Sequence, residues 1–158
     1  MKEKKKINVT DLLLFIVTAQ LAGTVSALAS GGFSGFYLQL EKPPLSPPAW
    51  LFPVVWTALY TLMGISAYLI YSSDDGGKKN ALAVYWVQLG VNFLWSIVFF
   101  RFMLLNAAVA VIILLLILIA MMIKMFRDIR PAAGYINIPY LAWAAFAAYL
   151  NIAFAIIN

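Results

Sequence analysis

The sequence contains no cysteine and no histidine among its 158 residues. The chain therefore cannot form disulfides, use a thiolate or an imidazole in catalysis, or supply the usual ligands of zinc, copper and haem iron. Charged residues are also scarce, at 11%, whereas 65% of the residues are hydrophobic. A soluble domain of this composition would have too little polar surface to cover itself. The composition predicts an integral membrane protein.

The few basic residues, which give a net charge of +5, predict the membrane topology. They stand at the ends of apolar runs and form no face interleaved with aromatic residues, so we expect no nucleic-acid partner. If the N-terminus is cytoplasmic, nine of the eleven Lys and Arg residues lie inside, and only Lys42 and Arg101 lie outside. The positive-inside rule thus predicts a cytoplasmic N-terminus, with the C-terminus and residues 30–47 on the opposite side. We expect a multi-pass protein of a bacterial cell membrane.

Apolar runs long enough to cross a hydrocarbon core of ~30 Å recur along the whole chain. They cover residues 9–29, 48–71, 80–101, 103–126 and 134–157. Runs such as AAVAVIILLLILIAMMI are apolar on every side, whereas the strands of a membrane barrel would alternate apolar and polar residues. The linkers are too short for a second domain. We predict an all-α bundle of five transmembrane helices, forming one domain over residues 1–158.

The longest linker ends in EKPPLSPPAW, with four prolines in ten residues. Proline suits the first turn of a helix, so we expect Pro47 and Pro48 to begin the second span. The prolines could serve only to separate two spans. Alternatively, they make residues 30–47 a rigid lid that loses little entropy on closing over a ligand. The sequence is compatible with both interpretations.

The tryptophans fall into two groups. Trp50 and Trp86 lie near span ends, as expected of the aromatic belt at a membrane interface. Trp56, Trp95 and Trp143 lie deeper in their spans, beyond the reach of such a belt. From the helical rise, Trp56 and Trp95 fall in the outer half of the bilayer, beneath the proline-rich loop.

Polar residues inside the spans occupy two helix faces. In the third span, Gln88, Asn92 and Ser96 follow at spacing four. The fifth span has a face made by Tyr140, Trp143, Ala147 and Asn151. Amides in hydrocarbon need partners, so both faces should point into the bundle. They could be interhelical hydrogen bonds, at about 0.6 kcal/mol each, or the orienting groups of a mostly apolar pocket for a planar ligand.

Two classes of membrane protein are disfavoured. Asp11 lies near the cytoplasmic end of the first span, and no carboxylate lies deep in any span, which argues against a proton-coupled transporter. No ring of charges or filter-like segment indicates a channel.

Small residues also recur at spacing four. They are Ala19, Gly23 and Ala27 in the first span and Ala144 and Ala148 in the fifth. Such faces allow helices to approach closely, either within the bundle or between two copies of the chain.

Three segments in this order, LEKPPLSPPAWLFPVVWTALY, QLGVNFLWSIVFF and IPYLAWAAFAAYLN, resemble the TspO/MBR family. This family comprises tryptophan-rich sensory proteins and translocator proteins, including the peripheral-type benzodiazepine receptor. The resemblance implies a five-helix bundle, commonly a homodimer, that binds hydrophobic small molecules in a pocket closed by the first loop. The ligands it implies are porphyrins such as protoporphyrin IX, sterols, and isoquinolines or benzodiazepines; no cofactor is required.

The resemblance also assigns pocket positions. Those that match are Tyr37, Pro47, Trp56, Tyr60, Asn92, Trp95, Trp143 and Ala147. We add Phe52, Gln88 and Asn151 as further candidates for ligand binding. Because histidine and cysteine are absent, we expect metal-free porphyrin rather than haem, held by stacking, with its propionates near Lys42 or Arg101.

The leading functional interpretation is a membrane receptor or sensor that binds porphyrins and sequesters or transports them. The alternative is an enzyme, because light- and oxygen-dependent porphyrin breakdown is attributed to the family; its catalytic residues would be Trp56 and Trp143. The sequence departs from the family at two places. Leu45 stands where many members have tryptophan, and IAFAIIN after Leu150-Asn151 lacks the cholesterol-recognition pattern of animal members, so we do not expect specific sterol binding.

Overall fold

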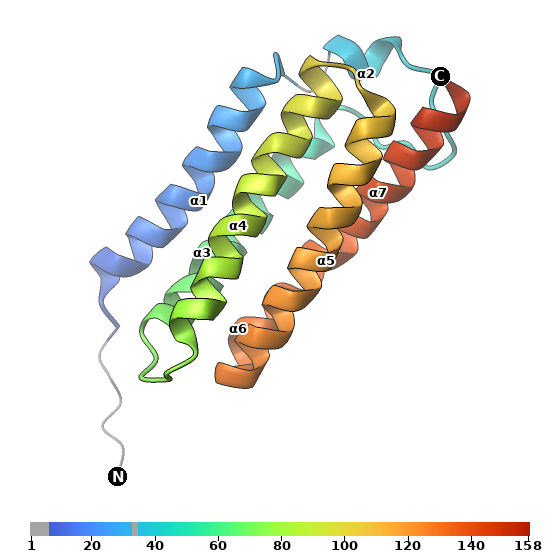
Figure 1. The fold of residues 1–158 in the computed structure, drawn as a ribbon. Coiled ribbons are helices and arrows are strands. Elements are labelled where there is room, and N and C mark those ends of the chain that lie inside the picture. Colours follow the sequence, from blue (N-terminus) through green and yellow to red (C-terminus); the bar gives the residue numbers. More distant parts are fainter. Residues whose placement is uncertain (1–6, 33–34) are drawn as a thin grey trace.

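The computed structural model describes residues 7–32 and 35–158, and all regular secondary structure in these ranges is helical (Figure 1). The long helices are α1 (Val9–Ala29), α3 (Leu51–Tyr71), α4 (Lys78–Ser96), α5 (Leu105–Ile129) and α7 (Ile138–Ile157). The short elements are α2 (Gly35–Gln39), a π-helix (Ile97–Arg101) that continues α4, and α6 (Pro131–Tyr135) before α7. Five segments are long and apolar enough to cross a membrane. The predicted all-α fold with five spans is confirmed.

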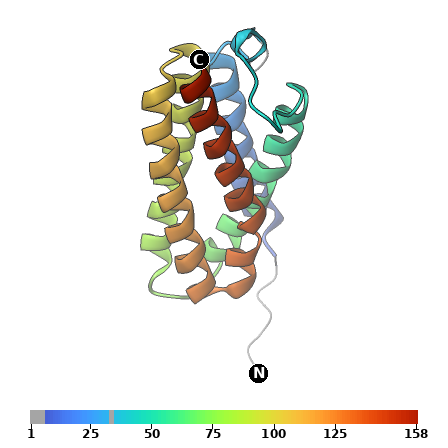
Figure 2. The same ribbon diagram turned by 90° about the vertical axis from the view of Figure 1, so that its right-hand side faces the viewer.

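Successive long helices run in opposite directions, so the loop with α2 and the end of α7 lie at the same end of the bundle (Figures 1 and 2). Helix α1 lies at the edge and packs on α3 and α4. It buries only Ala19 and Ser26, whereas α3 and α4 contribute most of the large buried side chains around the candidate site. Of the five long helices, α1 therefore has the fewest buried residues.

Small residues bring α1 against α3. A Cβ atom added to Gly64 would lie 2.5 Å from the Cα of Ile16, so the two backbones touch here. One turn further along α1, Ala19 is fully buried, and Gly23 lies against the ring of Tyr60. The spacing of small residues in the first span thus serves packing within the chain.

The start of α3 differs from the sequence prediction. Pro47 and Pro48 precede the helix, which begins at Leu51, so the prediction that these prolines begin it was wrong by three residues. Pro47 is instead held in the loop, because its carbonyl accepts a hydrogen bond from the Tyr37 hydroxyl at 2.7 Å. Pro53 lies in the first turn of α3, where the missing N–H has no intrahelical partner to lose.

The end of α4 is wound as a π-helix. Each turn of a π-helix contains an extra residue, and such turns occur frequently at functional sites. Here both Phe99 and Phe100 are buried, with their ring centroids 5.8 Å and 6.2 Å from that of Trp95. The chain then turns into α5 through Met103, which has a left-handed φ of 57°.

Candidate ligand-binding site

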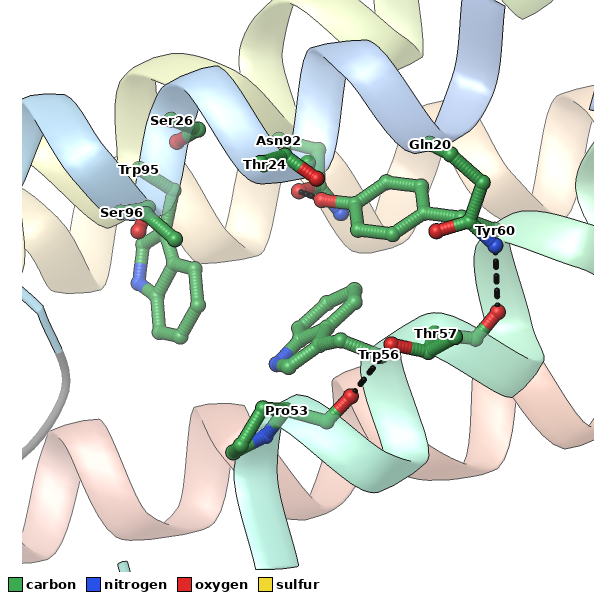
Figure 3. Close-up of a pocket in the computed structure, with 12 residues that line it drawn as sticks. Gln20, Thr24, Ser26, Pro53, Trp56, Thr57, Tyr60, Asn92, Trp95 and Ser96 are labelled. Atoms are coloured by element: carbon green, nitrogen blue, oxygen red, sulfur yellow. Dashed lines mark hydrogen bonds between the residues drawn. The ribbon is translucent and has the colours of Figure 1, made fainter. Parts of the chain in front are cut away.

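A cavity of about 210 Å³ lies between α1, α3 and α4, in the half of the bundle nearest the first loop (Figure 3). Its lining residues are Gln20, Gly23, Thr24, Ser26, Ala27, Pro53, Trp56, Thr57, Tyr60, Asn92, Trp95 and Ser96. Thr24, Pro53 and Thr57 are exposed on the outside of the bundle. Because these residues belong to α1 and α3, the cavity borders the lipid-facing groove between those helices.

Trp56 forms the aromatic wall of this cavity. Its ring stacks on Tyr60 at 5.5 Å and lies 6.3 Å from the ring of Trp95 and 6.2 Å from that of Tyr140. Its indole N–H has no hydrogen-bond partner among the described residues, although only 6% of the residue is exposed. Figure 3 shows this nitrogen pointing into the open space between Trp95 and Pro53. The cavity therefore presents a flat face with one free donor.

The deep polar residues form a chain of interhelical hydrogen bonds. The Tyr60 hydroxyl donates to Oδ1 of Asn92 at 2.8 Å, and Nδ2 of Asn92 donates to the Tyr140 hydroxyl at 2.8 Å. Tyr140 in turn donates to Oε1 of Gln88 at 2.7 Å, and Nε2 of Gln88 lies 3.8 Å from the sulfur of Met63. This chain joins α3, α4 and α7. The interhelical interpretation of Gln88 and Asn92 is correct, and Asn92 also lines the cavity.

Helix α1 supplies polar groups that were missing from the predicted site. Gln20 donates to the carbonyl of Thr57 at 2.7 Å and to Oγ1 of Thr61 at 2.8 Å, and Ser26 donates to the carbonyl of Phe93 at 2.9 Å. The signal was present in the sequence, because Gln20 and Ser26 flank the small residues at spacing four. The spacing of the small residues by itself indicates helix packing and not a lining of polar groups.

Other predicted residues surround a second, smaller void of about 20 Å³. It is lined by Tyr37, Phe52, Trp95, Phe99, Phe100, Ala147, Leu150, Asn151 and Phe154. Trp143 lines neither void. It is half-buried, with its ring 6.1 Å from that of Phe52, and its buried indole N–H has no partner among the described residues. Most of the predicted site residues thus line one or both voids, whereas Pro47, Gln88 and Trp143 line neither.

The first loop is attached to the bundle at several points. Tyr37 is buried, with its ring 5.2 Å from Phe52 and 5.6 Å from Phe154, and the amino group of Lys42 lies 5.3 Å from its ring centroid. Burial raises the pKa of the Tyr37 hydroxyl, and the nearby Ser46 side chain opposes part of this shift. The hydroxyl therefore stays protonated and donates to Pro47.

The far part of the loop is fastened to α7. The amide N–H of Glu41 donates to Oδ1 of Asn158 at 2.9 Å, and Nδ2 of Asn158 donates back to the carbonyl of Glu41 at 3.2 Å. The Tyr149 hydroxyl donates to the carbonyl of Pro44 at 2.9 Å. These contacts fasten residues 41–44 of the loop to α7 and its C-terminal cap.

The acid–base and metal chemistry of the site is limited. Within residues 7–32 and 35–158, no group of three or more His, Cys, Asp or Glu residues could hold a metal ion. The groups that face the cavity are aromatic rings, hydroxyls and amides. Such a site can stack, exclude water and donate hydrogen bonds, and it offers a bound molecule no carboxylate as a proton acceptor.

Comparisons with known proteins identify the family. The family model described as TspO/MBR matches residues 14–157. The chain belongs to the TspO/MBR family. It is 34% identical over 150 residues to the tryptophan-rich protein TspO of Archaeoglobus fulgidus, covering 88% of this chain and 97% of that protein. It is 35% identical over 139 residues to the tryptophan-rich sensory protein of Cereibacter sphaeroides, covering 88% and 85%.

An animal relative matches to a similar degree. The translocator protein of Ovis aries is 36% identical over 134 residues, covering 77% of this chain and 79% of that protein. Membership in the TspO/MBR family, together with five apolar helices of sufficient length, establishes a multi-pass integral membrane protein. The names sensory protein and translocator describe the relatives.

Proposed function

We propose that this protein is a membrane receptor or sensor that binds protoporphyrin IX and related hydrophobic planar molecules. The observation that carries the proposal is the cavity beneath the first loop, where the unpartnered indole N–H of Trp56 meets an aromatic wall formed with Tyr60 and Trp95. Stacking on these rings would supply most of the contact area. The free indole N–H would orient one acceptor atom of the ligand.

Charge and the absence of metal ligands narrow the choice of tetrapyrrole. The chain has no histidine or cysteine, so a metal-free porphyrin suits it better than haem. Arg101 is exposed at the end of the π-helix, and Lys42 lies in the loop, both at the same end of the bundle as the cavity. These two cations are the candidates for pairing with carboxylates on the rim of the ligand.

Quenching of tryptophan fluorescence by protoporphyrin IX tests this proposal in purified protein. We expect saturable quenching in the wild type and about tenfold weaker binding in Trp56→Phe, because the variant loses contact area and the free donor. Trp50→Phe is the matched control, because Trp50 is 65% exposed and lies outside both voids. Equal affinity in Trp56→Phe and Trp50→Phe would contradict the assignment of the site, and no saturable quenching in the wild type would contradict porphyrin binding.

A second candidate function is light- and oxygen-dependent porphyrin degradation that uses Trp56 and Trp143. The specific observation in its favour is that the indole N–H groups of both residues lack partners among the described residues. Illumination of bound and free protoporphyrin IX in the same detergent tests it. Faster bleaching and a distinct product are expected with the wild type but not with Trp56→Phe or Trp143→Phe. Identical bleaching and products for bound and free porphyrin would exclude catalysis.

Transport and dimerisation are tested separately. We propose that the same site passes its ligand along or across the membrane, in which case liposomes containing the protein should release trapped porphyrin faster than empty liposomes do. We also propose a homodimer, because α1 buries only two of its residues within the chain and leaves large apolar side chains exposed along its length. Native mass spectrometry of the detergent-solubilised protein should then give about twice the chain mass of 17.5 kDa. A single species at the chain mass would contradict the dimer.

A further inference from the structure

Trp95 lies between the two voids of the site and contributes to the lining of both. On one side its ring faces Trp56 across the larger cavity, at 6.3 Å between ring centroids (Figure 3). On its other side are Phe99 and Phe100 from the π-helix, which line the smaller void. One indole ring therefore borders both spaces.

The position of this ring depends on one polar contact. Nε1 of Trp95 donates to Oδ1 of Asn151 at 3.0 Å. The amide group of Asn151 is held in turn, because Nδ2 donates to the carbonyl of Leu105 at 3.1 Å. Asn151 is 1% exposed and Trp95 is 4% exposed, so water does not compete for this hydrogen bond. The aromatic rings beside Trp95, those of Trp56, Phe99 and Phe100, contact it without a hydrogen bond that would fix its direction.

The sizes of the two voids limit what the closed site can hold. The larger void is about 210 Å³, below the ~300 Å³ at which pockets for drug-sized ligands begin. The smaller one, at about 20 Å³, is large enough for about one water molecule. Its walls include Tyr37 from the loop and Phe154 from α7, so it extends directly beneath the lid. A planar macrocycle that lies wholly inside the bundle, and does not extend into the groove between α1 and α3, would need both spaces and the volume that the Trp95 ring occupies.

We propose that the Trp95 ring is a movable partition between the two voids. Its hydrogen bond to Asn151, here called the latch, holds the ring in place, and the position of the ring sets the upper size limit of the ligand. With the latch closed, the site accepts one- or two-ring aromatic molecules beside Trp56. When Trp95 swings out of its place, the two voids join, and a planar macrocycle reaches from Trp56 to Tyr37. A large ligand binds only the open arrangement. Its apparent affinity is therefore its intrinsic affinity multiplied by the fraction of protein in which the latch is open. This inference rests on the proposed ligand-binding function of the same site.

The test compares a large and a small probe in one variant and its control. Asn151→Ala removes the acceptor of the Trp95 hydrogen bond. The control, Asn137→Ala, also removes a fully buried asparagine with an interhelical bond, from Nδ2 to Oγ of Ser66 at 2.8 Å, but lies outside both voids. We expect Asn151→Ala to bind protoporphyrin IX about tenfold faster in stopped-flow measurements, as loss of one hydrogen bond implies. The association rate of isoquinoline should be unchanged, and Asn137→Ala should resemble the wild type with both probes.

A second measurement follows the partition itself. In protein labelled with 5-fluorotryptophan, the ¹⁹F signal of Trp95, assigned with Trp95→Phe, should shift when protoporphyrin IX saturates the site and should stay in place with isoquinoline. Trp95→Phe, which has a smaller ring and no N–H, should reproduce the faster macrocycle binding, so the test does not depend on Asn151→Ala being well folded. An unmoved Trp95 signal at saturation, or equal macrocycle rates in wild type and both variants, would overturn the partition while leaving ligand binding intact.

The two proposals can also fail separately. If the wild type does not bind protoporphyrin IX, the proposed function fails, and the partition is then judged with a graded series of two-, three- and four-ring planar hydrocarbons. If Trp95 is a partition, Asn151→Ala and Trp95→Phe should bind larger hydrocarbons of this series than the wild type does. Asn137→Ala should have the same size limit as the wild type. An unchanged size limit in both variants would overturn it.

Discussion

The hydroxyl of Tyr140 accepts a hydrogen bond from Nδ2 of Asn92 at 2.8 Å and donates one to Oε1 of Gln88 at 2.7 Å. Tyr140 is fully buried on α7, and both partners are on α4. A single side chain therefore bonds two buried amides. Tyr85, on the same helix as the amides, is equally buried, but its hydroxyl has no partner among the described residues.

Replacing each of these two tyrosines by phenylalanine should affect the stability of the protein differently. Tyr140→Phe should destabilise the protein by about 1–2 kcal/mol, because Asn92 loses an acceptor and Gln88 loses a donor. Tyr85→Phe should leave stability unchanged or raise it slightly, because it removes a buried hydroxyl without a partner. Unfolding in detergent mixtures, followed by circular dichroism, measures both. A loss in Tyr85→Phe as large as that in Tyr140→Phe would indicate that a bound water satisfies Tyr85.

Close contact between helix backbones predicts a steric effect at Gly64. Gly64→Ala would place a methyl group 2.5 Å from the Cα of Ile16 and 2.8 Å from its amide nitrogen, so α1 and α3 must separate. We expect a loss of about 1–3 kcal/mol in stability, as for other overpacked positions. Gly90→Ala is the control, because a Cβ there has nothing within 4 Å. Equal melting temperatures for the two variants would contradict the packing of α1 on α3.

Gly23 lines the larger cavity, and its lack of a side chain leaves room for the ring of Tyr60. A Cβ atom at Gly23 would overlap the edge of the Tyr60 ring, so Gly23→Ala must displace that ring or α1. Displacement would weaken the Tyr60–Asn92 hydrogen bond and narrow the cavity beside Trp56. We expect protoporphyrin IX affinity to fall about tenfold, measured by the same quenching assay, with Gly90→Ala again unchanged. Unaltered affinity in Gly23→Ala would show that the ligand does not use this wall.

The attachment of the loop predicts a specific change in hydrogen exchange. In Asn158→Ala, the amide of Glu41 loses its acceptor and should exchange about tenfold faster, as expected when one hydrogen bond is removed. Adding Tyr149→Phe, which releases the carbonyl of Pro44, should extend faster exchange to neighbouring loop amides. Asn106→Ala is an exposed asparagine control on α5. If Glu41 exchanges at the same rate in all variants, the contact with Asn158 does not hold the loop.

The absence of cysteine makes membrane orientation directly measurable, because one introduced cysteine is the only thiol in the chain. Leu45 is 80% exposed in the first loop, and Lys79 is exposed at the opposite end of the bundle. If the positive-inside prediction is right, a membrane-impermeant maleimide added to intact cells labels Leu45→Cys, while Lys79→Cys is labelled only after lysis. The reverse pattern would invert the topology.

The number of spans and their helical type followed from sequence because both depend on local properties. A run of about 20 apolar residues must satisfy its backbone hydrogen bonds within itself in lipid, so it forms a helix whatever its neighbours are. The face shared by Gln88 and Asn92 also followed from spacing alone. The start of α3 did not, because the Tyr37 hydroxyl holds Pro47 in the loop, and that contact joins residues on two sides of a turn.

Only the tertiary structure decided which polar side chains form hydrogen bonds with each other across helices. The sequence placed Gln88, Asn92 and Asn151 in the interior, but it could not show that Asn92 bonds Tyr60 and Tyr140 while Asn151 bonds Trp95. It also gave no sign that α1 lines the cavity or that Trp95 borders both voids. These features depend on how side-chain volumes such as those of Gly64 and Ile16 set the distance and rotation of neighbouring helices. The sequence by itself determined which segments cross the membrane and which residues lie at each depth, because helix rise and backbone hydrogen bonding are local, whereas packing between distant segments decided the shape of the site.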